Sequence, residues 1–236
     1  MNFLKLSVLN GLVVLFSCCG NAELKDTDVI APQYNVAVLV YPGIELLSVA
    51  GPSEVLNNAG GYNVYTVSVR PGKVHTSKGF IFLSDYNIQN APQPDILIVP
   101  GGPLDEILTL AEDKELIGWI KVVNQNTRFT MSVCSGALIL AKAGLLDGKT
   151  VTTHSTAIEP LRKLNPKTTV ISGVKFVRDG KILSTAGITS GIDGTLQLLS
   201  GISGLEVAKS VSKVLEYDKW DPKNTLTVKI KERPSN

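Results

Sequence analysis

Residues 129–144 read FTMSVCSGALILAKAG, a strand pattern that runs directly into a helix pattern. Phe129 to Val133 predicts a buried strand, and Gly136 to Ala143 predicts a helix that Gly144 ends. Cys134 stands on the turn between them, where a side chain points out of the sheet and neighbouring N–H groups face what it attacks. We therefore predict a nucleophile elbow at Cys134, with a thiol pKa lowered by the positive end of the helix. The alternative is a buried cysteine that packs as a small hydrophobe.

Strand and helix patterns alternate along the rest of the chain. Apolar, β-branched runs predict further strands at 35–40, 62–69, 80–83, 95–99, 150–153, 169–176 and 181–186. Helical spacing of apolar residues predicts further helices at 45–59, 114–124, 158–164, 190–199 and 205–214. This alternation predicts an α/β fold, a doubly wound, mostly parallel sheet sandwiched by helices, because parallel strands need right-handed helical crossovers. The turn Arg178-Asp179-Gly180 predicts one antiparallel hairpin.

Ligands in such sheets bind beyond the carboxyl ends of the strands, so the turns after Val40, Val99 and Val133 are the candidate sites. The turn at 100–103 reads Pro-Gly-Gly-Pro and brings free N–H donors close to a ligand. The N–H of Gly102 and that of Ser135 could form an oxyanion hole. The alternative is an ordinary turn.

Four other polar residues lie near strand or helix ends. His154, after the strand at 150–153, is a candidate base or orienting group, or a structural histidine. Glu45 and Ser48 lie one helical turn apart and could project towards the cleft. Asp193 lies near a helix N-terminus, where an acid is stabilising. The remaining histidine, His75, sits in a polar stretch and is expected at the surface.

Length and composition exclude several classes of protein. The 236 residues suit one α/β domain with terminal extensions. With 44% hydrophobic and 19% charged residues the chain is not disordered throughout. A net charge of +2 does not indicate the basic surface that a nucleic-acid-binding protein needs. Three cysteines and two histidines are too few for a disulfide framework or a multi-histidine metal site, so we expect neither metal nor cofactor.

The N-terminus predicts export. Residues 1–22 combine one early lysine, a short apolar run and small residues, as in a secretory signal peptide, and the run is too short to span a bilayer. Leu15-Phe16-Ser17-Cys18 resembles a bacterial lipoprotein box, with Cys19 as a competing site, whereas Gly20-Asn21-Ala22 would suit ordinary signal peptidase. We favour a lipoprotein, held in the periplasm or at a membrane only through its lipid. A buried N-terminal helix is the alternative.

The domain limits follow from these patterns. After the signal we expect a polar tether at 23–33, the folded domain at 34–216 and a C-terminal extension at 217–236. The alternating stretch 225–230 within the extension could be an edge strand or a partner-binding arm, and a loosely docked extension is the alternative.

Taken together, the motifs resemble those of the DJ-1/PfpI family, within the class I glutamine-amidotransferase-like superfamily. The resemblance covers residues 35–214 and is nearest to the isonitrile hydratases and the sensor halves of AraC-type regulators. The motifs that carry it are YPG at 41–43, AGPSEV at 50–55, VPGG at 99–102, VCSGA at 133–137, AGLLDGK at 143–149, TTH at 152–154 and AGITSGID at 186–193.

This resemblance implies a flavodoxin-like sandwich that forms a homodimer, with Cys134 as nucleophile, Ser135 as the adjacent hydroxyl and His154 near the reactive thiol. PfpI-type proteases carry histidine directly after the cysteine, so Ser135 argues against a protease. Hydratases carry an acid four positions before the proline of Gly51-Pro52, and this chain has Ser48 there. A serine cannot shuttle protons near neutral pH as a carboxylate can, so we consider Glu45 as a substitute.

We expect a cysteine-dependent hydratase, hydrolase or lyase that acts on an electrophilic carbon of a small molecule, similar to an isonitrile hydratase. The alternative is a non-catalytic redox or ligand sensor that uses the same cysteine. Transcription control is disfavoured, because too few residues follow Val214 for DNA-binding domains, and no nucleic-acid partner is expected.

Overall fold

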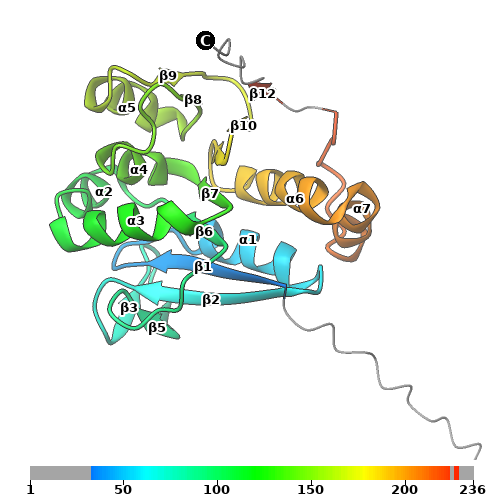
Figure 1. Ribbon diagram of the computed structural model, residues 1–236, viewed down its shortest axis with the longest axis horizontal. Helices are drawn as coiled ribbons and strands as arrows, with labels where there is room; N and C mark the ends of the chain where they lie inside the picture. Colours follow the sequence, from blue (N-terminus) through cyan, green and yellow to red (C-terminus); the bar gives the residue numbers. More distant parts are fainter. Residues whose placement is uncertain (1–32, 224–225, 229–236) are drawn as a thin grey trace, which may run out of the picture. The chain divides into compact units, whose positions relative to one another are not determined.

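Eight strands form the central sheet within residues 33–223 and 226–228, which are those that the computed structural model describes (Figure 1). Their order is β12-β10-β11-β7-β6-β1-β2-β5. The bounds are β1 Tyr34–Val40, β2 Tyr62–Ser68, β5 Tyr86–Asn87, β6 Ile96–Val99, β7 Phe129–Ser132, β10 Phe176–Asp179, β11 Ile182–Thr185 and β12 Leu226–Val228. All neighbours pair in parallel except β10 and β11, which form an antiparallel hairpin. The predicted doubly wound, mostly parallel sheet is confirmed.

Helices cover both faces of this sheet. Their bounds are α1 Leu46–Asn57, α2 Leu104–Leu110, α3 Lys114–Asn126, α4 Ala137–Lys142, α5 Ile158–Leu164, α6 Ser190–Ser203 and α7 Leu205–Val214. Figure 1 shows α1, α6 and α7 grouped together, and α2 to α5 grouped on the opposite side. Because both faces are covered, Val36 to Val40 in β1 and all of β6 are buried. No helix of the described residues is long and apolar enough to cross a membrane.

Several boundaries differ from those predicted. The predicted strand 169–176 is interrupted: Thr169–Val170 forms β9, and Phe176 begins β10. Arg178 and Asp179 pair within β10, so the hairpin turns at Gly180 rather than over 178–180. Short β8 (Thr150–Val151) pairs with β9 outside the main sheet. Neither β5, α2 nor β3 (Lys73–His75) was expected; β3 pairs with β4 (Ile81–Leu83), which lies in the predicted run 80–83. Elements this short depend on tertiary pairing more than on local pattern.

The predicted signal peptide at 1–22, with its lipoprotein box, lies outside the described residues, as does the tether apart from its last residue. In the C-terminal extension, Leu226 to Val228 pairs in parallel with β10 at the edge of the sheet. The edge-strand reading of that stretch is therefore the correct one for these three residues.

A buried acid anchors the start of the C-terminal extension. Asp193, in the first turn of α6 as predicted, is 2% exposed and pairs with Lys175 Nζ at 2.7 Å. It also accepts a hydrogen bond from the Tyr217 hydroxyl at 2.8 Å, and Lys175 donates to the carbonyl of Lys219 at 3.0 Å. Residues 217–219 are thus held against α6 by charge-assisted hydrogen bonds.

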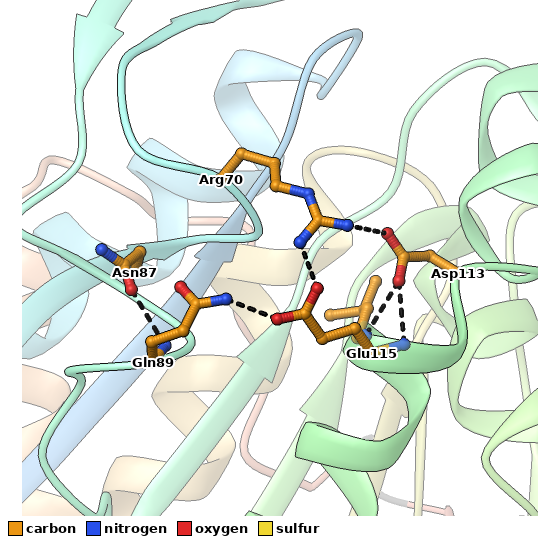
Figure 2. A network of polar contacts seen from close by, with 6 residues as sticks. Arg70, Asn87, Gln89, Asp113 and Glu115 are labelled. Atoms are coloured by element: carbon orange, nitrogen blue, oxygen red, sulfur yellow. Dashed lines mark hydrogen bonds and ion pairs between the residues drawn. The ribbon is translucent and has the colours of Figure 1, made fainter.

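A surface network holds the N-terminus of α3 (Figure 2). The side chain of Asp113 caps α3 by accepting from two amides of its first turn, at 2.9 and 3.1 Å. Arg70, which follows β2, lies between Asp113 (3.6 Å) and Glu115. The side-chain amide of Gln89 donates to the Glu115 carboxylate at 2.5 Å, and the backbone N–H of Gln89 donates to the side chain of Asn87 at the end of β5. The loops after β2 and β5 are therefore tied to the start of α3.

The connection from β7 to α4 leaves no room for a side chain at Gly136. A Cβ added there would lie 2.1 Å from the carbonyl oxygen of Val99 and 2.8 Å from that of Pro100. Both contacts are with backbone, which cannot rotate away as a side chain can. The strand-to-helix turn can therefore approach the end of β6 only because residue 136 is glycine.

We expect Gly136→Ala to lower the free energy of unfolding by about 2–3 kcal/mol, since backbone must move to accommodate the methyl group. The matched control is Gly118→Ala, at an exposed position inside α3 where an added Cβ meets nothing within 4 Å. That change should raise stability by about 0.5–1 kcal/mol, because alanine favours helix. Urea unfolding of both variants tests this, and equal effects of the two changes would contradict it.

Candidate active site

Cys134 occupies a backbone conformation that non-glycine residues rarely adopt. Its φ is +57°, in the left-handed region, which costs of order 1–3 kcal/mol. Hydrogen bonds hold it there: its N–H donates to the Ala186 carbonyl (2.9 Å), and its carbonyl accepts from the Thr153 hydroxyl (2.7 Å) and the His154 N–H (3.4 Å). The predicted strand-to-helix elbow therefore exists, between the ends of β7, β6 and β11, with the 3-10 turn η1 (Cys134–Gly136) leading into α4.

The glycine loop after β6 packs directly against this elbow. A Cβ added at Gly101 would lie 2.6 Å from both the N and the Oγ of Ser135, and 2.8 Å from the Cβ of Cys134. Gly101 therefore lets the loop approach the nucleophile, which is the close approach that the sequence predicted for a glycine here. The loop is held from the other side by Tyr41, whose buried hydroxyl donates to the Pro100 carbonyl at 2.7 Å.

A cavity of about 210 Å³ opens beside the elbow. Five of the six residues predicted for the site line it: Glu45, Gly102, Cys134, Ser135 and His154. It lies where β1 and β6 are neighbours although β2 follows β1 in the chain. Such a switch in strand order is where doubly wound sheets bind ligands. The sequence did not identify the other lining residues, which are Ser77, Lys78, Pro103, Leu104, Thr156 and Ile188.

The hydroxyl of Ser135 is engaged with the glycine loop. The N–H of Gly102 donates to Ser135 Oγ at 3.0 Å, and the Ser135 hydroxyl donates back to the Gly102 carbonyl at 2.7 Å. The expectation that Gly102 presents a free N–H to an oxyanion is therefore wrong in this structure, because the serine already accepts that hydrogen bond. The backbone N–H of Ser135 has no such partner among the described residues, and Ser135 favours the charged form of the adjacent Cys134 thiol.

The thiol of Cys134 does not have the lowered pKa that was predicted. Its pKa is raised from the ordinary value, first of all because burial penalises the thiolate; the residue is 6% exposed. Hydrogen bonds from Ser135 oppose the shift, and the negative charge of Glu45 adds to it. The helix-dipole argument omitted the desolvation of the sulfur, which is the largest effect on this pKa. Cys134 is buried yet forms part of the cavity wall.

Glu45 is positioned by the backbone at the start of α1. It is the N-terminal cap residue of the helix, its carbonyl accepts from the Ser48 N–H at 3.0 Å, and its own N–H donates to the Gly101 carbonyl at 2.9 Å. Its carboxylate accepts from the Ser77 hydroxyl at 3.4 Å and lies near enough to Cys134 to raise the pKa of the thiol. Glu45, considered from the sequence as a substitute acid, therefore lines the same cavity as the nucleophile.

Ser48 does not reach the cavity. It lies on the buried face of α1, is fully buried, and its hydroxyl has no hydrogen-bond partner among the described residues. A buried hydroxyl without a partner costs about 1–3 kcal/mol. Position 48 therefore contributes no side chain to the lining of the cavity.

His154 lines the cavity, with its ring tied to its own turn. Its Nδ1 lies 2.9 Å from the Thr156 hydroxyl and accepts from the Thr156 N–H at 3.3 Å, so the ring caps the short turn η2 (Ser155–Ala157). Gly187 lies against the ring, since a Cβ there would be 3.2 Å from Cδ2. Among the described residues neither this ring nor the Glu45 carboxylate forms a hydrogen bond to the Cys134 sulfur. Because Nδ1 is engaged with Thr156 while Glu45 acts electrostatically on the thiol, an orienting or structural role is favoured for His154.

Two further expectations concern the remaining polar residues. His75 is exposed on β3, as predicted, and its carbonyl accepts from the Gly43 N–H at 2.8 Å. No cluster of three or more metal-binding side chains occurs in the part of the chain that the structure describes. The site as it stands is a thiol, a carboxylate and backbone donors around a small cavity.

Comparison with known proteins assigns the family. The DJ-1/PfpI family matches residues 34–200. An isonitrile hydratase from Pseudomonas putida is 32% identical over 182 residues, which are 77% of this chain and 78% of that protein. The HTH-type transcriptional regulator CdhR from Pseudomonas aeruginosa is 30% identical over 182 residues, and the match spans 74% of this chain and about half (52%) of the regulator.

Among solved structures, a ThiJ/PfpI family protein from Pseudomonas syringae has a TM-score of 0.75 and 27% identity, covering 83% of this chain and 80% of its own. This likeness confirms the flavodoxin-like sandwich that the motifs implied. With the family match across most of the folded part and the identity to the hydratase, the chain belongs to the DJ-1/PfpI family.

Proposed function

We propose that the protein is an enzyme in which Cys134 attacks an electrophilic carbon of a small molecule. The observation that carries the proposal is the left-handed elbow at Cys134 on the wall of a cavity that also contains the Glu45 carboxylate. A nucleophile needs a nearby group that takes its proton, and a carboxylate within reach of a thiol meets that need.

The proposed chemistry begins with a protonated thiol. The S–H proton passes to the Glu45 carboxylate while the sulfur forms a bond to the substrate carbon. For an isonitrile, that proton is then delivered to the same carbon, so a thioimidate is formed. Water adds to this carbon, the C–S bond breaks, and the sulfur regains a proton. The net change is the addition of one water molecule to give a formamide, with Cys134 restored.

Negative charge that develops on the substrate during attack needs a donor. The proposed donor is the Ser135 N–H, because it follows Cys134 in the elbow and Ser135 already favours the charged form of the thiol. Gly101 and the Ser135 hydroxyl have a positioning role, because they hold the glycine loop against the elbow that carries Cys134.

Similarity to an isonitrile hydratase supports hydration as the reaction class. The predicted signal peptide at 1–22 leads us to propose further that the protein works outside the cytoplasm, in the periplasm or attached to a membrane through a lipid. As the family resemblance implies, we also propose a homodimer.

Replacement of the nucleophile should abolish turnover. We expect Cys134→Ala to reduce kcat of any substrate found to the background rate, because no carbon–sulfur bond can form. Steady-state kinetics on the purified protein measure this. The matched control is Gly118→Ala, at an exposed position of α3 that does not line the cavity, which should leave kcat unchanged. Turnover retained by Cys134→Ala would contradict the proposal.

The raised pKa of Cys134 gives a pH dependence with a defined sign. Alkylation by iodoacetamide needs the thiolate, so its rate should fall as the pH is lowered, with a midpoint above that of a free cysteine thiol. Glu45→Gln removes a negative charge that raises this pKa, so the midpoint should move to lower pH and alkylation at pH 7 should accelerate.

The same substitution should slow turnover by about 100-fold, because the proton acceptor is lost. Opposite effects on alkylation and turnover distinguish a proton acceptor from a residue that only supports the fold. Glu206→Gln, at an exposed position on α7, is the control and should change neither rate. A parallel loss of both rates in Glu45→Gln would exclude the proposed role.

The second candidate is a sensor that binds a ligand at Cys134 without turnover. Similarity to the regulator CdhR, together with Ser48 in place of the acid, favours it. A redox sensor is less well supported, because a raised thiol pKa leaves little thiolate at neutral pH.

We therefore expect Cys134 to oxidise more slowly than free cysteine at pH 7. Treatment with graded hydrogen peroxide, followed by intact mass to count added oxygen atoms, measures this, with Cys134→Ala as the reference for other oxidation sites. Oxidation of Cys134 faster than that of free cysteine would favour the redox sensor over the enzyme.

A further inference from the structure

One cation at the cavity has no partner. Lys78 lines the cavity and is exposed, and it makes no ion pair or hydrogen bond with the residues that the structure describes. By contrast, Lys142, Lys149 and Lys175 each pair with an acid. An unpaired ammonium group at the mouth of a cavity is free to attract an anionic group of a bound molecule.

The backbone holds Lys78 at this place. It lies in the turn between β3 and β4, and the N–H of the preceding residue, Ser77, donates to the Ile44 carbonyl at 3.0 Å. The turn is closed by a hydrogen bond from the Thr76 N–H to the Phe80 carbonyl at 2.9 Å. Thr76 also forms a bridge with Ile44 in the loop that leads to Glu45. The hairpin is therefore fastened to the segment that carries the carboxylate.

Charge is divided across the cavity. Glu45 acts electrostatically on the Cys134 thiol, which is 6% exposed, whereas Lys78 is exposed. The negative charge of Glu45 therefore acts on the buried sulfur, and Lys78 lines the cavity from its solvent-exposed rim. A substrate that places its reactive carbon at the sulfur would be repelled if it carried an anion there, but attracted if the anion lay at its outer end.

The volume limits the size of such a substrate. About 210 Å³ corresponds to roughly seven water molecules at 30 Å³ each. Only a small molecule, or one end of a larger molecule, fits between the sulfur and the rim.

We propose that the substrate is a small carboxylate, with its electrophilic carbon at Cys134 and its carboxylate at Lys78. This inference rests on the function proposed above and adds the substrate class. Since Lys78 is exposed, the contribution is modest: pairs of this kind are worth up to about a fivefold change in affinity, and less at high salt.

The test uses acid and amide pairs of two cysteine reagents with different reach. They are iodoacetate with iodoacetamide, and maleimidopropionate with its amide. In the first pair an S–C bond forms, the C–I bond breaks, and iodide and a proton leave. In the second, the sulfur adds to the C=C bond and the adjacent carbon takes a proton. For each pair the ratio of the acid rate to the amide rate at Cys134 is measured on the reacted full chain by mass spectrometry of its proteolytic peptides, which separates Cys134 from Cys18 and Cys19.

In Lys78→Gln we expect this ratio to fall by about threefold for at least one pair, with the amide rates unchanged. Higher ionic strength should lower the ratio of the unsubstituted protein in the same direction. Lys73→Gln is the matched control, since Lys73 is exposed on β3 of the same hairpin but does not line the cavity. It should leave both ratios unchanged.

Three results would overturn the inference. If both ratios are the same in Lys78→Gln as in the unsubstituted protein, the carboxylate subsite is excluded while the role of Cys134 stands. If Lys73→Gln lowers the ratios as much as Lys78→Gln does, the effect is one of general surface charge. If none of the reagents modifies Cys134, the proposed nucleophile itself is wrong, and the substrate class is lost with it.

Discussion

The left-handed backbone at Cys134 is the constraint on which the site depends. A side chain other than glycine at φ +57° is strained, so the conformation persists only where the surroundings determine it. Here three hydrogen bonds hold its N–H and its carbonyl, and glycines at 101 and 136 allow the neighbouring backbone to close around it. The strands bring these groups together, because the ends of β6, β7 and β11 are adjacent in the sheet.

The same packing decides the chemistry of the thiol. Close contact around the elbow removes water from the sulfur, and the loss of hydration raises the pKa of Cys134 further than the Ser135 hydrogen bonds lower it. A thiol that is protonated at neutral pH reacts only if its proton is removed during attack. The elbow therefore needs a proton acceptor, and a site with this geometry but without a carboxylate would be suited to binding rather than turnover.

Much of the fold could be predicted from the sequence, because buried strands such as 36–40 and 96–99 are continuous apolar runs followed by turn residues. The elbow could be predicted as well, since it depends on local residue types. Lys78 could not, because it reaches the cavity through a hairpin paired with residues more than thirty positions earlier. Nor could the sign of the Cys134 pKa shift or the engagement of the Gly102 N–H, since both depend on how tightly non-local backbone packs.

Glu45 shows how the chain provides a carboxylate at the cavity although Ser48, inside α1, does not line it. The direction of a side chain inside α1 would depend on the rotation of the helix. Glu45 is instead the N-terminal cap residue, and hydrogen bonds of its own N–H and carbonyl fix its position. One of these joins it to Gly101, whose loop packs against Cys134. The acid and the nucleophile are thus positioned by the same loop, so a change in one position is transmitted to the other. The unpartnered hydroxyl of Ser48 indicates that this position no longer contributes a hydrogen bond to the site.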